Sequence, residues 1–124
     1  MAEGMKMLGA ALAALPEVRE LMMNIDAGTS PVAVSGLASV HRAQLAAALR
    51  QQLDRPLLVL CADENEANRM ALDLTALLGE EVSLLFAREW QLRDRVSASH
   101  GWEQQRIGTL CRLAAGEASV LVAT

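Results

Sequence analysis

Apolar residues recur at helical spacing along the first 28 positions of the chain. One stripe is formed by Met5, Leu8, Leu12 and Leu15. Pro16 is well suited to the first turn of a second helix, through which a further stripe runs from Val18 to Ile25. Gly28 stands where the C-terminal cap of that helix is expected. The pattern therefore predicts two short helices at the N-terminus.

From residue 29 onwards, apolar runs of strand length alternate with longer segments of helical periodicity. The predicted strands cover residues 31–35, 56–62, 81–87 and 119–123. Helices are expected over residues 38–53, 63–78 and around 107–114. The run 56–62 is almost continuously apolar, which is typical of a parallel strand buried on both faces. This alternation predicts an α/β fold with a three-layer parallel sheet, preceded by the N-terminal helices.

Single residues indicate the ends and the inward faces of the later helices. Asp63 is a candidate N-cap, and Glu66 completes a capping-box pattern three residues later. Gly79 and Gly116 are expected to end the helices that precede them. The inward faces are predicted to consist of Ala67, Met70, Ala71, Leu74, Leu77 and Leu78 in the first of these helices and of Ile107, Leu110, Cys111 and Ala114 in the second.

The length of 124 residues suits one domain. Residues 1–28 are interpreted as a helical segment that packs on a domain of residues 29–124. The sequence stops at Thr124, directly after a predicted buried strand. We therefore expect the chain to be truncated from a longer protein.

Composition narrows the class of protein. Hydrophobic residues make up 52% of the chain and charged residues 21%, which is enough to form a core. No apolar run approaches a membrane span of about 18 residues, and no signal-peptide pattern begins the chain. Two cysteines form no disulfide framework, which favours a reduced, cytoplasmic protein. A net charge of −4, no strongly basic block and 2% aromatic residues disfavour autonomous nucleic-acid binding.

The segment 35–42 follows the first predicted strand, where a nucleotide would bind in a fold of this kind. A phosphate-binding loop needs G-x-x-x-x-G-K-[ST], but Val40, His41 and Arg42 stand in the last three places. The only lysine of the chain, Lys6, precedes every predicted strand. Two interpretations remain. The segment is a degenerate phosphate loop, or it is an ordinary turn in which Ser39 caps the next helix.

The degenerate phosphate loop would comprise Ser35, Gly36, Ser39, His41 and Arg42. Neither interpretation predicts a bound cofactor or ATP hydrolysis by this chain. No catalytic residue is expected.

No metal site is expected either. The two histidines, His41 and His100, lie 59 positions apart, and a zinc site needs about four convergent ligands. Cys61 and Cys111 are each predicted to be small core residues. The acidic group around Asp63 and Glu66 could hold magnesium, but helix capping explains it without a metal.

The segment 88–99 is the most unusual part of the sequence. Arginines bracket Trp90 in a predicted loop, and Glu89 and Asp94 lie among them. The loop could be a contact surface for another domain or for a nucleic-acid backbone. It could equally be a surface loop held by one buried tryptophan, with its charges neutralising one another. The residues of the candidate interaction surface are Arg88, Glu89, Trp90, Arg93 and Arg106.

Several motifs occur in a fixed order: PVAVSGL, RPLLVLCADENEANRMALDL, LLFAREW and SASHGWEQQRIGTLCRLAAGEASVLVAT. In this order and spacing, residues 17–124 resemble the beginning of bacterial transcription-repair coupling factors (Mfd proteins). Proteins of that family begin with a region similar to domain 1a of the excision-repair protein UvrB. The resemblance implies a RecA-like fold related to P-loop NTPases and helicase motors, with a degenerate phosphate loop.

The resemblance also implies a function. The parent family consists of ATP-dependent DNA translocases that displace stalled RNA polymerase and recruit UvrA, using ATP and Mg in a distant motor. The present chain would then be a non-catalytic scaffold domain. Its partners would be adjacent domains, and through the full-length protein UvrA, RNA polymerase and DNA, without a membrane. The alternatives are a truncated nucleotide-dependent helicase-type motor domain and a receiver-like signalling domain that binds magnesium at Asp63.

Overall fold

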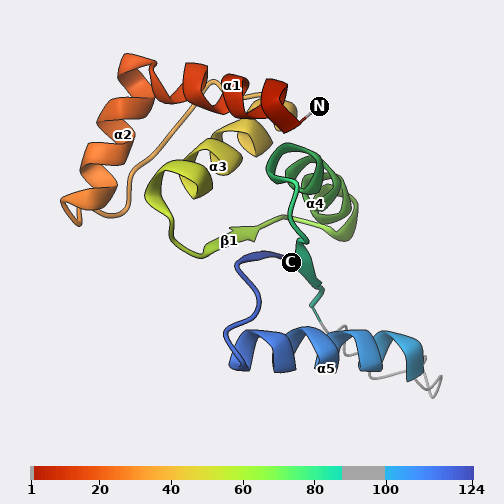
Figure 1. Ribbon diagram of the computed structural model, residues 1–124. Coiled ribbons are helices and arrows are strands. Elements are labelled where there is room, and N and C mark those ends of the chain that lie inside the picture. The colour runs from red at the N-terminus through yellow and green to blue at the C-terminus, as the bar shows by residue number, and fades with distance from the viewer. Residues whose placement is uncertain (1, 88–99) are drawn as a thin grey trace. The chain divides into compact units, whose positions relative to one another are not determined.

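A computed structural model describes residues 2–87 and 100–124 (Figure 1). The described residues form five helices and three strands. The helices are α1 (Ala2–Ala13), α2 (Pro16–Asp26), α3 (Ser39–Leu53), α4 (Glu64–Leu78) and α5 (His100–Ala114), and the strands are β1 (Leu57–Leu60), β2 (Ser83–Leu85) and β3 (Val120–Ala123). The chain divides into two compact units, residues 1–55 with 73–80 and residues 56–72 with 81–124.

The first unit is helical. Helix α1 packs on α3, and the buried residues of α3 are the alanines Ala43, Ala47 and Ala48. These small side chains let the two helices approach closely. Gly9 of α1 lies against Gln51 of α3, because a Cβ atom at position 9 would stand 2.5 Å from Oε1 of Gln51. The two N-terminal helices expected from the sequence are confirmed, with Pro16 in the first turn of α2 and Gly28 at a φ of 74° beyond its end.

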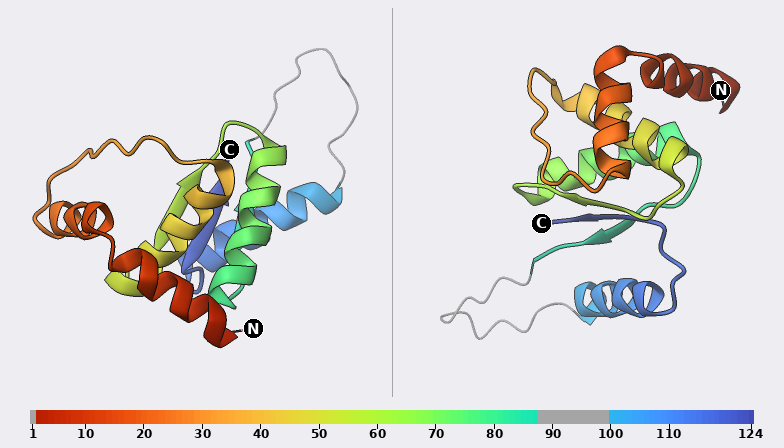
Figure 2. Two further views of the ribbon diagram at one scale, coloured as in Figure 1. Left: turned by 90° about the horizontal axis from the view of Figure 1, so that it is seen from above. Right: turned by 90° about the vertical axis from the view of Figure 1, so that its left-hand side faces the viewer.

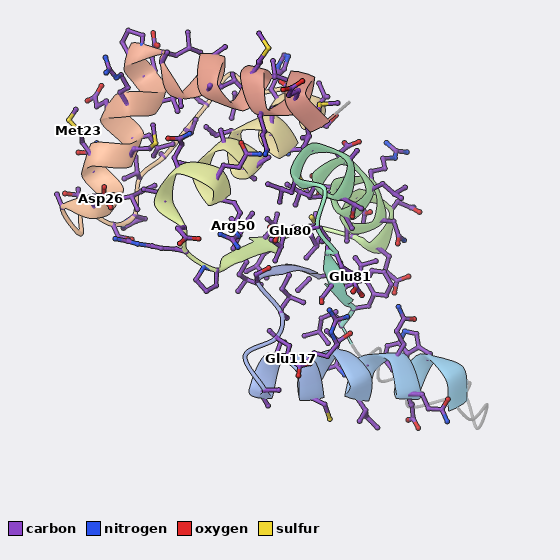
Figure 3. All side chains as sticks on the ribbon, in the orientation of Figure 1. Met23, Asp26, Arg50, Glu80, Glu81 and Glu117 are labelled. Carbon is purple, nitrogen blue, oxygen red and sulfur yellow. The ribbon has the colours of Figure 1, made fainter. Side chains whose placement is uncertain are left out.

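Arg50 connects the end of α3 to the turn that follows α4. Its side chain is only 17% exposed and lies 3.2 Å from Oδ1 of Asp54 and 3.4 Å from Oε1 of Glu80 (Figure 3). Arg55 reaches Asp26 at 3.1 Å, and both of these side chains are largely exposed. Exposed ion pairs contribute about 0–1 kcal/mol each, so the Arg55–Asp26 pair adds little to the stability of this unit.

The second unit is built on a parallel sheet with the strand order β1-β3-β2 (Figure 2). Leu57 of β1 aligns with Val120, and Ser83 of β2 aligns with Leu121. Strand β3 lies at the centre and is buried along its whole length, with Val120 and Val122 fully inaccessible. A chain segment that is apolar at every position and central in a sheet is what a parallel arrangement requires. The predicted parallel sheet is confirmed.

Two of the predicted strands differ from expectation. Residues 31–35 form no strand, and all five are exposed. Their β-branched composition favours a strand, but a strand forms only where a partner accepts its backbone hydrogen bonds. The predicted burial of 56–62 on both faces is also wrong, because Leu58 is 59% and Leu60 is 74% exposed. Strand β1 is an end strand, and its alternate residues face opposite sides.

Helix α4 begins and ends as the sequence predicts. The Glu66 amide donates to Oδ1 of Asp63 at 2.8 Å, and the Ala62 amide donates to Oε2 of Glu66 at 3.0 Å. Gly79 follows the helix with a φ of 68°, a backbone conformation that favours glycine. The predicted inward residues Ala67, Met70, Ala71 and Leu74 are buried, and Leu77 and Leu78 are half-buried.

The helical segment 1–28 lies within the first unit together with α3. Its separation from a domain of residues 29–124 stays a prediction. None of the helices in the described part of the chain is long and apolar enough to span a membrane.

Candidate interaction surface

Three side chains of helix α5 contact strand β2 or the residues that flank it. Arg112 Nη1 lies 2.7 Å from Oε1 of Glu81, and the Thr109 hydroxyl donates to the Leu84 carbonyl at 3.2 Å. Arg106 Nη1 donates to the Phe86 carbonyl. Positions 106, 109 and 112 are each three residues apart and therefore share one helix face. Because their partners occur in the reverse order, α5 runs antiparallel to β2.

This arrangement corrects the predicted face of α5. The expected inward residues are exposed: Ile107 by 59% and Leu110 by 43%, while Cys111 and Ala114 are also exposed. Among residues 101–114 of the helix, Thr109 is instead the buried one. The physical reason is that β2 presents backbone carbonyls, which need donors. A hydroxyl and a guanidinium supply them, whereas a leucine would leave buried carbonyls unsatisfied.

A groove of about 190 Å³ lies beside the helix, lined by Trp102, Glu103, Arg106, Ile107 and Leu110. The guanidinium carbon of Arg106 lies 6.0 Å from the centroid of the Trp102 ring. At this separation the cation is attracted to the aromatic face. The tryptophan and the Phe86 carbonyl together hold Arg106 in place. The groove thus combines an apolar wall with one acidic and one basic side chain.

Most of the predicted interaction surface cannot be compared with this groove. Arg88, Glu89, Trp90 and Arg93 lie outside the described residues, so their contact role stays a prediction. Arg106 is described and lines the groove. Sequence reasoning did not single out Trp102 or the outward side of Ile107 and Leu110. The i, i+4 spacing of Trp102 and Arg106 was the available signal for their contact.

The segment 35–42 differs from a phosphate loop in both sequence and structure. It does not follow a strand, because residues 31–35 are not one. The predicted capping role of Ser39 is also wrong. Ala38 occupies the cap position of α3, without a side-chain hydrogen bond, and Ser39 is the first helical residue. Gly36 has a φ of 81°, which explains a glycine at this turn. Ser35, Gly36, Ser39, His41 and Arg42 are all exposed.

The acidic group at the start of α4 acts in helix capping. Asp63 and Glu66 both accept backbone hydrogen bonds. Within the two described ranges, no cluster of three or more His, Cys, Asp or Glu side chains could hold a metal ion.

The two cysteines differ in environment. Cys61 directly follows β1 and is half-buried. Burial raises the pKa of the Cys61 thiol, and the carboxylates of Glu66 and Asp63 raise this pKa further. Cys111 is exposed, so its predicted core position is wrong. The correction follows from the orientation of α5, which turns Cys111 away from β2.

Comparison with known proteins assigns the chain to no family. No protein-family model, curated protein or solved structure matches it. The functional proposal therefore rests on the residues themselves and on the geometry described above.

Proposed function

We propose that the chain is a non-catalytic scaffold domain of a bacterial transcription-repair coupling factor. The observation that carries this proposal is the order of motifs along residues 17–124, combined with a phosphate-loop segment that has no lysine. Lys6 is the only lysine and belongs to α1, upstream of that segment. A loop without this cation has no side chain to reach the terminal phosphates. The fold proposed with this function is RecA-like.

The parallel sheet is consistent with the proposal. The RPLLV motif supplies β1 and the VLVAT motif supplies the central strand β3. The last long motif also contains Arg106 and Thr109, whose side chains hold α5 on β2. Residues of the motif thus have structural roles that need no nucleotide.

The role proposed for the chain is to present a surface to neighbouring parts of a longer, cytoplasmic protein. In that protein a distant motor would use ATP and Mg, and the whole would engage UvrA, RNA polymerase and DNA. The groove beside Trp102 and Arg106 is the described part of the proposed contact surface. The other members are Arg88, Glu89, Trp90 and Arg93.

A calorimetric titration with Mg-ATP, together with a steady-state ATPase assay, tests this proposal. We expect neither heat of binding nor turnover. Binding at micromolar concentration without turnover would mean that the 35–42 segment retains a nucleotide site. It would then contradict the interpretation of this segment as an ordinary turn. Turnover above background would contradict the scaffold role and favour a truncated helicase-type motor domain. The Lys6→Ala variant is the matched control, because turnover that persists in it does not use the lysine.

A further inference from the structure

The outer edge of β2 carries carbonyl groups that could extend the sheet. Ser83 and Leu85 align with β3, and the Thr124 amide donates to the Leu85 carbonyl at 3.2 Å. Because consecutive residues of a strand point their backbone groups to opposite sides, the Leu84 and Phe86 carbonyls point away from β3. Unpaired groups at a sheet edge are a template for pairing with a strand of another chain.

Helix α5 occupies both of these carbonyls with side-chain donors. The Thr109 hydroxyl donates to Leu84 and the Arg106 guanidinium donates to Phe86. Thr109 is 9% exposed and Arg106 is half-buried, so the hydroxyl donor is shielded from water and the guanidinium donor is shielded in part. The Arg112–Glu81 ion pair lies on the same line and holds the C-terminal half of the helix beside the strand.

The opposite edge of the sheet is different. The amides of Leu57 and Cys61 donate to Ser119 and Ala123 on β3, so the backbone groups of Leu58 and Leu60 point outward. No strand in the described residues pairs with this edge, and both leucine side chains are exposed. A sheet with two available edges can add copies head to tail, the β1 edge of one on the β2 edge of the next. Copies joined by such a head-to-tail contact do not close into a ring, and they therefore form filaments.

We propose that Arg106 and Thr109 form an edge guard, which prevents the β1 strand of a second copy from pairing with β2. The guard acts by using the two acceptors that such a strand would need. Its role is independent of the scaffold function, because it concerns association of the chain with itself.

The test is the double variant Arg106→Met/Thr109→Val in the full chain. Both replacements keep much of the side-chain volume and remove the donors. Sedimentation velocity over rising protein concentration measures association, and infrared spectroscopy of the amide I band detects intermolecular strands. We expect the unaltered chain to remain monomeric and the double variant to form polymers with an intermolecular β signal. A folded double variant that stays monomeric, or an unaltered chain that polymerises in the same way, would overturn the proposal.

Two further variants test whether the uncovered carbonyls cause the association and whether β1 is the strand that pairs with β2. Arg112→Gln breaks the ion pair with Glu81 but leaves both carbonyls covered, so it should stay monomeric. Equal association of this variant would indicate that a loosened helix suffices, contrary to the proposal. Leu58→Pro removes an outward amide from β1, a substitution that an edge strand tolerates. Added to the double variant, it should restore the monomer, and polymers that persist would exclude β1 as the occupant.

If the double variant does not fold, Thr109→Val alone carries the test, since it exchanges one hydroxyl for a methyl group. It should associate at protein concentrations at which the unaltered chain remains monomeric. A folded Thr109→Val chain that is monomeric throughout would overturn the edge guard.

Discussion

Asp63 and Glu66 satisfy two backbone amides at the start of α4, over a span of only five residues. The first four amides of a helix have no partner within the helix, so side-chain acceptors at this end are stabilising. The carboxylate of Asp63 accepts from Glu66, while that of Glu66 reaches past the cap to Ala62. The bond from the Glu66 amide to Asp63 is local, which is why the sequence pattern predicted this cap correctly. The pattern did not predict the contact of the Glu66 carboxylate with Ala62.

Replacement of Asp63 by alanine should lower the free energy of unfolding by about 1 kcal/mol, because it leaves the Glu66 amide without its acceptor. Urea denaturation followed by circular dichroism measures this loss. Asp63→Asn is the matched control and should retain most of the stability, since its amide oxygen accepts the same bond. Equal losses in the two variants would show that the charge, rather than the acceptor, stabilises the helix.

Cys61 should react with alkylating agents only at a higher pH than an unstructured cysteine. Burial and the Glu66 and Asp63 carboxylates raise the pKa of its thiol, and the thiolate is the reactive form. A raised pKa reduces the thiolate fraction at any pH below it. The pH profile of iodoacetamide labelling in a Cys111→Ser variant tests this, with a short cysteine peptide as reference. A labelling midpoint at or below that of the peptide would contradict the expected direction.

At the scale of elements, the sequence predicted the C-terminal half of α5 around residues 107–114, but it predicted neither the start of the helix at His100 nor the face that the helix buries. Periodicity indicates the apolar side of a helix, and here Ile107 and Leu110 form that side. The face that packs is decided by the partner, and β2 offers the carbonyls of Leu84 and Phe86. Their positions depend on the pairing of β2 with β3, which is distant in sequence. No window of residues within α5 contains this information.

Substitutions on a buried helix face and on an exposed helix face should therefore differ in their effect on stability. Leu74 of α4 is fully buried, and Leu74→Ala should cost about 2–5 kcal/mol in unfolding free energy. Ile107 is 59% exposed, so Ile107→Ala should change stability by no more than about 0.5 kcal/mol. Urea midpoints of the two variants and the unaltered chain make the comparison. A loss of several kcal/mol for Ile107→Ala would place that residue in a core and support the original face prediction.

At the scale of the whole molecule, alternation of strands and helices was sufficient to predict an α/β fold with parallel strands. It overestimated the sheet by one strand, because the β-rich composition of residues 31–35 carries no information on whether a neighbouring strand is available to it. The same missing information made β1 look doubly buried, although it ends the sheet. For the segment 35–42 the sequence alone was sufficient, because it shows directly that the segment contains no lysine.

The net negative charge of the isolated chain should prevent it from binding duplex DNA. Phosphate contacts supply nearly all of non-specific binding and require clustered basic side chains. The chain has a net charge of −4, and among the arginines of the described residues Arg50, Arg55 and Arg112 already lie in ion pairs. Fluorescence anisotropy with a labelled duplex at about 150 mM salt should show no saturation up to about 100 μM protein, the weak end of non-specific affinity. Saturable binding that weakens steeply with salt would contradict this. Loss of that binding in an Arg88→Ala/Arg93→Ala variant would then identify the segment around Trp90 as a nucleic-acid contact, and the chain would have a direct role in DNA binding instead of a scaffold role alone.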